Sequence, residues 1–174
     1  MDLDLGKTMM VRKAVLKDAQ DIYTLINEYA KEGILLPRSL NSIYENIRDF
    51  WVCEREGEIL GCCALHIVWE DLAEIKSLAV RKDVRNSGIG SLLVEKSLQE
   101  AEDLGIKKVF VLTYATGFFG KFNFYEVKKE SLPHKVWGEC INCVKFPHCD
   151  EVAMIFEFST SNIIKQAQTK GIRS

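Results

Sequence analysis

The residues with the clearest chemistry form the run R-N-S-G-I-G from Arg85 to Gly90. The run lies between an apolar, strand-like segment (75–80) and a segment with helical spacing (89–104). Two glycines let the backbone approach a ligand closely and turn sharply into a helix whose first N–H groups have no partners. These N–H groups and the positive end of the helix dipole attract anions, and Arg85 adds a cation that pairs bidentately with phosphate. The run therefore predicts a phosphate-binding turn.

Other phosphate-binding patterns fit this chain less well. A P-loop requires a glycine-rich stretch ending in Gly-Lys-Ser/Thr, and no such string occurs. A dinucleotide fingerprint requires a third glycine, but Gly90 is followed by Ser91-Leu92-Leu93. The plain alternative is a tight turn before a surface helix. The strand-like flank ending in Leu78-Ala79-Val80 favours the phosphate site over that alternative.

Composition and charge argue against several classes of function. The chain has 174 residues, of which 47% are hydrophobic and 28% charged, as is typical of one globular domain. Its net charge of -2 offers no basic surface for nucleic acid. No apolar run has the length of a membrane span, and no signal peptide opens the chain. We therefore expect a cytoplasmic domain over 9–158, with a flexible extension over 1–8 and a tail over 159–174.

Hydrophobic spacing predicts the elements that position this turn. A helix with a predicted N-cap at Asp18 ends at Gly33, and a shorter helix follows that carries Ile43, Ile47 and Phe50. Strands are expected over 10–15, 51–54, 59–69, 72–80, 109–113, 124–128 and 153–158, and a short helix over 117–122. The long helix is expected to bury Ile89, Leu92, Leu93, Ala101 and Leu104. This order predicts a mixed α/β domain with one parallel crossover through the long helix.

The turn after Leu78-Ala79-Val80 resembles the acetyl-CoA pyrophosphate loop of the GNAT acetyltransferase superfamily, Arg/Gln-x-x-Gly-x-Gly/Ala. Further strings resemble one branch of that superfamily, the N-acetylglutamate synthases, which are amino-acid N-acetyltransferases of arginine biosynthesis. These strings are LPRS (36–39), LHIVWEDLAEIKSLAV (65–80), VFVLT (109–113) with Phe118-Phe119, and Leu132-Pro133. The resemblance covers about residues 10–158. Because no amino-acid kinase domain accompanies it, the chain resembles the short, stand-alone form.

The resemblance implies a GNAT-like α/β fold, with a mixed, mostly antiparallel sheet flanked by helices. In that fold the strands expected at 72–80 and 109–113 splay apart, and the gap receives the pantetheine arm of acetyl-CoA. Acetyl-CoA is thus the implied co-substrate. The residues implied to bind it are Leu78, Ala79, Val80, Arg85, Asn86, Ser87, Gly88, Ile89, Gly90, Ser91, Thr113 and Phe119.

Acetyl transfer to an amine requires a base, because an amino group is mostly protonated at neutral pH. The resemblance implies that Glu74 is this base, acting directly or through a water, and that a strand N–H near Leu78 stabilises the oxyanion. The alternative for Glu74 is a solvated strand residue paired with Lys76. At the place of the superfamily's tyrosine general acid this chain has Phe119, which leaves the proton donor to CoA open.

Three residues are predicted to bind the acceptor substrate. Arg38, in a loop stiffened by Pro37, suits a substrate carboxylate because its guanidinium makes a planar two-point contact. Ser39 belongs to the same loop, and Lys76 lies on the strand beside Glu74, where it would contact a second carboxylate. The alternative for Arg38 and Lys76 is that each is a surface cation.

The six cysteines fall into two groups. Three lie in apolar, strand-like stretches and are expected to be buried, reduced thiols: Cys53, Cys62 and Cys63. The other three, with a nearby histidine, have the residue types of a zinc site: Cys140, Cys143 and Cys149, with His134 or His148. A single C-x-x-C pair with an isolated third cysteine favours a loop without metal over that zinc site. His66 is expected to find its partner within the sheet rather than to ligate a metal.

Three functions remain open from the sequence. The first is acetyl transfer from acetyl-CoA to the α-amine of a free amino acid, L-glutamate or L-glutamine, as the first step of arginine biosynthesis. The second is acetyl transfer to a protein or peptide, and the third is a regulator that binds acetyl-CoA without catalysis. Arg38 and Lys76 favour a small anionic substrate and hence the first function. We expect no nucleic-acid or membrane partner, and whether the chain forms a homodimer is left open.

Overall fold

The computed structural model describes residues 8–141, 143, 145 and 148–159. These residues form two compact units: the first comprises Met1–His66 and Glu74–Glu100, and the second Ile67–Ala73 and Ala101–Ser174, each within the described range. The extension expected over 1–8 and the tail expected over 159–174 lie outside the described residues, apart from Thr8 and Ser159.

The first unit is built on antiparallel strands. Its strands β1 (Met10–Lys13), β2 (Phe50–Arg55), β3 (Glu58–Trp69) and β4 (Leu72–Val80) are neighbours in that order. The turn between β2 and β3 has positive φ at both Glu56 (52°) and Gly57 (80°). Two such residues match the twist of a tight hairpin, so the predicted hairpin is confirmed.

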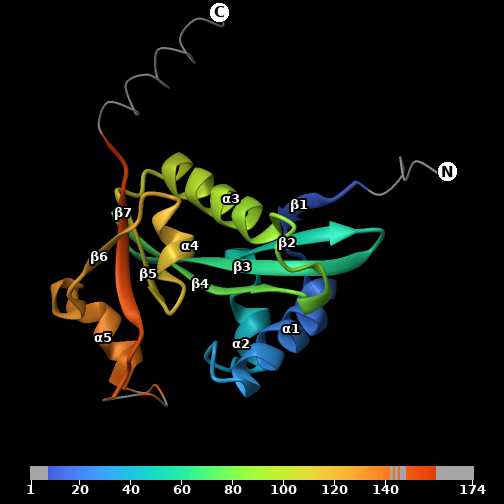
Figure 1. Ribbon diagram of the computed structural model, residues 1–174, viewed down its shortest axis with the longest axis horizontal. Coiled ribbons are helices and arrows are strands. Elements are labelled where there is room, and N and C mark those ends of the chain that lie inside the picture. Colours follow the sequence, from blue (N-terminus) through green and yellow to red (C-terminus); the bar gives the residue numbers. More distant parts are fainter. Residues whose placement is uncertain (1–7, 142, 144, 146–147, 160–174) are drawn as a thin grey trace, which may run out of the picture. The chain divides into compact units, whose positions relative to one another are not determined.

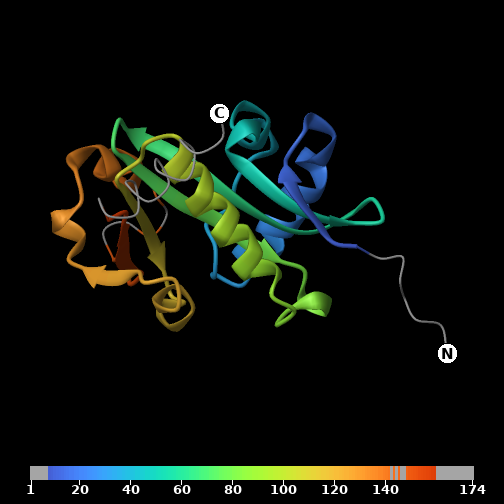
Figure 2. The same cartoon turned by 90° about the horizontal axis from the view of Figure 1, so that it is seen from above.

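Helices cover both faces of these strands (Figure 1). On one face lie α1 (Ala19–Lys31) and α2 (Leu40–Glu45), and on the other lies α3 (Ile89–Asp103). Seen from above, α3 runs obliquely across the strands (Figure 2). Its approach requires Gly61 on β3, because a Cβ there would lie 3.0 Å from Ile89 Cγ2 and 3.1 Å from Leu93 Cδ1. The core on the α1 side includes Ile22, Ile26, Ile43, Phe50 and Val52.

Asp18 is the N-cap residue of α1 as predicted, but its side chain does not cap the helix. A 3₁₀ turn, Leu16–Asp18, precedes the helix, and the Asp18 side chain makes no capping hydrogen bond to α1. Instead its carboxylate accepts from the Val15 N–H at 2.8 Å and pairs with Arg12 at 2.7 Å. A strong cation on β1 therefore outcompeted the weaker helix amides for this carboxylate.

Two helix predictions also need correction. The second helix ends at Glu45 and a 3₁₀ turn, Ile47–Asp49, follows, so that Phe50 is the first residue of β2. On the long helix, Ile89, Leu93 and Ala101 are buried as expected, but Leu92 is 39% exposed and Leu104 58% exposed. Leu92 precedes Leu93 by one residue, which turns it about 100° away from the buried stripe.

The second unit has strands β5 (Lys108–Thr113), β7 (Val152–Glu157) and β6 (Tyr125–Val127), neighbours in that order and antiparallel. It also contains α4 (Thr116–Gly120) and α5 (His134–Ile141). Its core comprises Leu72, Phe110, Leu132, Val136, Ala153 and Ile155. Helix α5 was not predicted, since the sequence favoured a cysteine-containing loop for this segment. Pro133, just before the helix, is the signal that was available, since proline favours a helix start.

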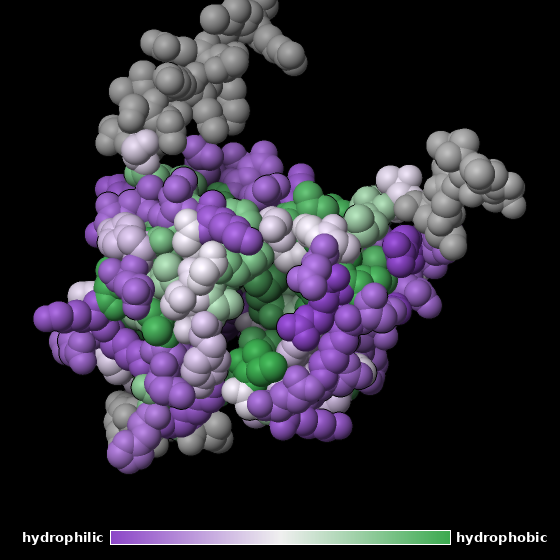
Figure 3. All heavy atoms as spheres, viewed as in Figure 1, coloured by the Kyte–Doolittle hydropathy of each residue, from purple (hydrophilic) through white to green (hydrophobic). Residues whose placement is uncertain are grey.

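The surface over α1 is mainly hydrophilic in the view of Figure 3, as expected for an amphipathic helix that buries its other face. Within the described residues, no helix is both long and apolar enough to span a bilayer.

Candidate active site

The predicted phosphate-binding turn is exposed and joins β4 to α3. A 3₁₀ turn, Lys82–Val84, follows β4, and the next residues include two with positive φ, Asn86 (63°) and Gly88 (86°). The Ser87 hydroxyl donates to the Val84 carbonyl and thereby closes the turn. Residues 85–88 are exposed, and no atom lies within 4 Å of a Cβ built on Gly88. Space next to the first N–H groups of α3 is therefore available to a phosphate.

Tyr29 of α1 supports this end of β4. Its hydroxyl donates to the Val80 carbonyl at 2.5 Å. The Lys82 Nζ lies 5.6 Å from the centre of the Tyr29 ring, and the Arg85 Cζ lies 5.9 Å from it. One aromatic ring thus contacts both the strand end and the cations beside the turn. Tyr29 was not among the predicted site residues.

Strand β4 carries both Glu74 and Lys76. Glu74 is only 9% exposed, so the alternative of a solvated strand glutamate is wrong. Lys76 is half-buried on the same strand. Because they are two residues apart on a strand, Glu74 and Lys76 share one face of β4.

Arg38 is held against β4 rather than lying free on the surface. Its Nη1 donates to the Ser77 hydroxyl of β4 at 3.3 Å, and its Nη2 donates to the Ser42 hydroxyl of α2, also at 3.3 Å. The guanidinium carbon lies 5.1 Å from the centre of the Phe50 ring. The structure therefore brings Arg38 to the strand that carries Glu74 and Lys76. The sequence did not predict Ser42 and Ser77 as partners of Arg38, because a serine alone does not indicate such a contact.

Ser39, the third predicted substrate residue, has a structural task. Its hydroxyl accepts from the Ser42 N–H at 3.0 Å and caps α2. A capped helix keeps its first turn in place. Ser39 thereby fixes the position of Ser42, the residue that holds one nitrogen of Arg38.

A local distortion of β4 lies next to Arg38. Ser77 has a φ of 56°, in the left-handed region, although it lies within the strand. The thiol of Cys62 on β3 donates to the Ser77 carbonyl at 3.4 Å. Burial raises the pKa of this thiol far above its usual range, while a hydrogen bond from the Ala79 N–H opposes the rise. Cys62 is therefore a neutral, buried thiol that contacts the backbone on both sides of Leu78, as its strand position predicted for burial.

Two predicted acetyl-CoA residues belong to the second unit. Thr113, at the end of β5, is 9% exposed, and its hydroxyl accepts from the Ala115 N–H at 2.9 Å. Phe119 of α4 is 3% exposed and packs edge-on against Phe118 and Phe124 at centroid distances of 5.0 and 5.3 Å. Phe119 has no proton to give to a leaving thiolate.

Within the described residues, the cysteines at and after α5 form no disulfide: Cys140, Cys143 and Cys149. Over the described part of the chain, no three His, Cys, Asp or Glu side chains converge in a way that would hold a metal. Residues 142, 144, 146 and 147 of this segment lie outside the described residues. His66 contacts Asp49 through Nδ1 at 2.7 Å, so it has a partner as expected, but this partner lies in the 3₁₀ turn before β2 and not in the sheet.

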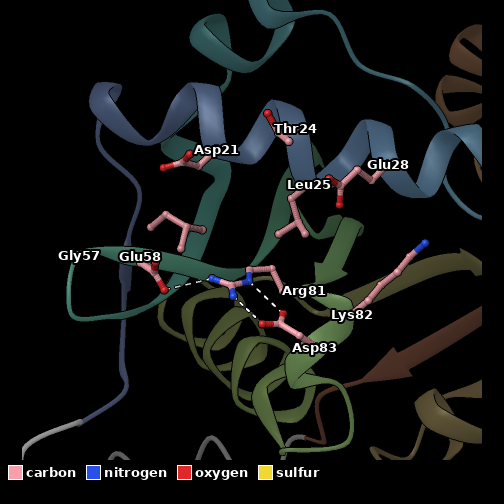
Figure 4. Close-up of a pocket in the computed structure, with 10 residues that line it drawn as sticks. Asp21, Thr24, Leu25, Glu28, Gly57, Glu58, Arg81, Lys82 and Asp83 are labelled. Atoms are coloured by element: carbon pink, nitrogen blue, oxygen red, sulfur yellow. Dashed lines mark hydrogen bonds and ion pairs between the residues drawn. The ribbon is translucent and has the colours of Figure 1, made fainter.

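A pocket of about 530 Å³ lies elsewhere on the first unit. It is lined by residues of α1, of the β2–β3 hairpin and of the segment after β4: Asp21, Thr24, Leu25, Glu28, Gly57, Glu58, Ile59, Arg81, Lys82 and Asp83. Figure 4 shows Arg81 between two carboxylates, at 2.6 Å from Asp83 and 3.2 Å from Glu58. None of the predicted site residues lines it.

Similarity to known proteins agrees with this geometry. Residues 16–124 match the acetyltransferase (GNAT) family. An uncharacterized N-acetyltransferase of Chlorobaculum tepidum is 48% identical over 83% of this chain and 94% of its own length. An amino-acid acetyltransferase of Mycobacterium tuberculosis is 39% identical over 75% of this chain and 76% of its own length.

A similar solved structure contains bound ligands. The N-acetylglutamate synthase of Neisseria gonorrhoeae, complexed with coenzyme A and N-acetyl-glutamate, has a TM-score of 0.79 and 26% identity to this chain. The similarity covers 87% of this chain and 35% of that one. The mixed α/β fold with its mostly antiparallel strands, the exposed turn before α3 and the family match lead to one conclusion: this chain belongs to the GNAT acetyltransferase family, whose acetyl donor is acetyl-CoA.

Proposed function

We propose that this enzyme transfers an acetyl group from acetyl-CoA to the α-amine of a small amino acid, L-glutamate or L-glutamine, as in the first step of arginine biosynthesis. The observation that carries the proposal is the position of Arg38. Two hydroxyls accept from its terminal nitrogens at 3.3 Å, one from Ser42 of α2 and one from Ser77 of β4, the strand that also bears Glu74 and Lys76. The relatives named amino-acid acetyltransferase support the same class of substrate.

In this proposal Arg38 and Lys76 select the acceptor. Arg38 is preorganised by its two hydroxyl partners, so little side-chain entropy is lost when it binds a carboxylate. Its planar fork suits one carboxylate, and Lys76 supplies a point charge for a second. Two cations on this face suit a free dicarboxylic amino acid better than a peptide, in which the α-carboxylate is consumed in the chain.

Glu74 takes the proton that leaves the ammonium group of the acceptor. The neutral amine then attacks the thioester carbonyl carbon, the new C–N bond forms, and the oxygen becomes an oxyanion. A backbone N–H of β4 near Leu78 stabilises this oxyanion. The C–S bond breaks as the carbonyl re-forms, and CoA leaves as a thiolate that takes up the second amine proton, with solvent as relay because Phe119 offers none.

The turn holds the donor. The N–H groups from Asn86 to Gly90 and the cation of Arg85 bind the pyrophosphate, with Ser91 in the first turn of α3 beside them. Exposure of residues 85–88 and the open space at Gly88 support this assignment. The contacts proposed for the rest of acetyl-CoA within this unit come from Leu78, Ala79 and Val80.

Release of free thiol from acetyl-CoA, measured across the twenty amino acids and a set of peptides, tests the proposal. We expect turnover with glutamate or glutamine to exceed that with any peptide by at least about tenfold in kcat/KM, which corresponds to about 1.4 kcal/mol. Faster turnover with peptides would instead assign a protein acetyltransferase. Tight acetyl-CoA binding without turnover of any amine would assign a regulator.

A further inference from the structure

We propose that Ser77 is a positioning residue that links the hold of Arg38 on the substrate to the backbone conformation of β4. The inference rests on the proposed function, because it assumes that Arg38 binds a carboxylate of the acceptor. It adds that this binding also controls the alignment of the β4 backbone at Leu78, where the oxyanion donor is proposed. Ser77 therefore affects the rate of the reaction as well as substrate affinity.

The first observation is the backbone of Ser77. Four non-glycine residues in the described chain have positive φ, and three of them lie in turns: Glu56, Asn86 and Asn123. Ser77, at 56°, is the one inside a strand. The left-handed region is unfavourable for an L-residue, and serine lacks the local compensation that asparagine has. Such a conformation persists only where surrounding groups hold it.

The second observation is what holds the backbone. The Cys62 thiol donates to the Ser77 carbonyl at 3.4 Å, and the Ala79 N–H donates to the same sulfur. One buried side chain thus contacts the β4 backbone on both sides of Leu78, next to the left-handed Ser77. Cys62 is completely buried, so no water competes for these contacts.

The third observation is what holds the side chain. The Ser77 hydroxyl accepts from Arg38 Nη1, while the Ser42 hydroxyl accepts from Nη2 at the same distance of 3.3 Å. Ser42 lies on α2 and Ser77 on β4, so the two hydroxyls hold one guanidinium from different elements. Of the two, only Ser77 can transmit a movement of Arg38 to the strand.

Three single variants separate side-chain and backbone effects: Ser77→Ala, Ser77→Gly and Ser42→Ala. In Ser77→Ala the hydroxyl is lost and the left-handed conformation keeps its cost, so we expect KM for glutamate to rise about tenfold and kcat to fall about tenfold. In Ser77→Gly the hydroxyl is lost but the conformation is free of cost, so KM should rise equally and kcat should stay within about threefold of wild type. In Ser42→Ala only KM should rise.

A cysteine pair provides a matched control. Cys62→Ala removes the thiol that holds the Ser77 carbonyl, whereas Cys63→Ala removes an equally buried thiol whose partner is Ser97 of α3. Each variant removes one buried sulfur atom, so the two are expected to lower the melting temperature by similar amounts. We expect only Cys62→Ala to lower kcat.

The outcomes separate this inference from the proposed function. Wild-type turnover is measured first: if no carboxylate-bearing amino acid is acetylated, the proposed function fails and the inference fails with it. If wild type is active, equal kcat in Ser77→Ala and Ser42→Ala overturns the inference alone. An equal loss of kcat in Ser77→Gly and Ser77→Ala also overturns it. Glycine adopts the left-handed conformation without cost, so such a loss would mean that the hydroxyl does not act by supporting the backbone.

Discussion

Arg38 and Ser77 are 39 residues apart in the sequence, yet Nη1 of the guanidinium lies 3.3 Å from the Ser77 hydroxyl. This hydrogen bond connects a loop before α2 with the distorted part of β4. The bond fixes the guanidinium of Arg38 against β4, the strand that carries Glu74. A fixed cation pays less entropy on binding a carboxylate than a free surface arginine does.

Replacing Arg38 by alanine should raise KM for glutamate by about 10- to 150-fold, because a hydrogen bond to a charged group is worth roughly 1.5–3 kcal/mol. Arg38→Lys should recover only part of this loss, since one ammonium cannot make both contacts of a planar fork. Steady-state kinetics with glutamate varied, together with calorimetric titration of acetyl-CoA, measures the effect. The control is Arg48→Ala, an exposed arginine in the 3₁₀ turn before β2. An equal effect on acetyl-CoA affinity would contradict a role in acceptor selection.

Replacing Glu74 by glutamine should lower kcat by about 10²- to 10⁴-fold, the range for loss of a general base. The loss should shrink as pH rises, because the amine of the acceptor is then already neutral. The measurement is kcat from pH 6 to 10 for wild type and variant. Glu70→Gln, at an exposed position in the turn before β4, serves as the control. A small decrease that is flat across pH would make Glu74 a structural residue only.

Replacing Gly88 by valine should weaken acetyl-CoA binding at least about tenfold, or about 1.4 kcal/mol. Its φ of 86° is a conformation that a β-branched residue avoids, so the turn would rearrange. Gly105→Val is the matched control, because Gly105 has a φ of 83° at the other end of α3 and is equally open around its Cβ. Calorimetry on both variants compares them, and equal affinities would argue against pyrophosphate binding at this turn.

Replacing Gly61 by alanine should destabilise the protein by about 1–3 kcal/mol, the usual cost of overpacking. The new Cβ would lie 3.0 Å from Ile89 Cγ2 and 3.2 Å from the Ala79 carbonyl oxygen, so α3 and β4 would have to move. Gly117→Ala in α4 meets no atom within 4 Å and should be neutral or slightly stabilising. Thermal unfolding of both variants tests this, and a matching melting temperature for Gly61→Ala and wild type would refute it.

Asp18 should make stability depend on acid pH. Burial alone would raise the pKa of Asp18, but hydrogen bonds from Arg12 and from the Val15 N–H outweigh burial and lower the pKa below 3.8. A lowered folded-state pKa adds stability that is complete above the unfolded-state pKa and disappears as pH falls through the folded-state value. Asp18→Asn should therefore cost about 1.5–3 kcal/mol at pH 7, and this difference should shrink toward pH 2. Urea unfolding at both pH values measures it, with exposed Asp21→Asn as the control.

Local sequence determined the turn between β4 and α3 and most strands. Glycines at 88 and 90, a strand before them and a helix after them impose short-range constraints, and the turn forms where they predict. The hairpin at Glu56-Gly57 and the burial of Cys53, Cys62 and Cys63 follow equally from alternation and turn chemistry. The exception was α5, where Gly138 and the cysteines obscured the helical spacing.

Tertiary structure alone decided what surrounds the candidate active site. The sequence indicated Arg38 and Glu74 as single residues, but not that Ser42 and Ser77 would hold one guanidinium, nor that Glu74 would be buried. The left-handed conformation of Ser77 runs against the strand propensity of its segment, and Cys62 on another strand bonds to its carbonyl. Contacts between residues far apart in the chain depend on packing, and their energies outweigh local preferences only once the fold has formed.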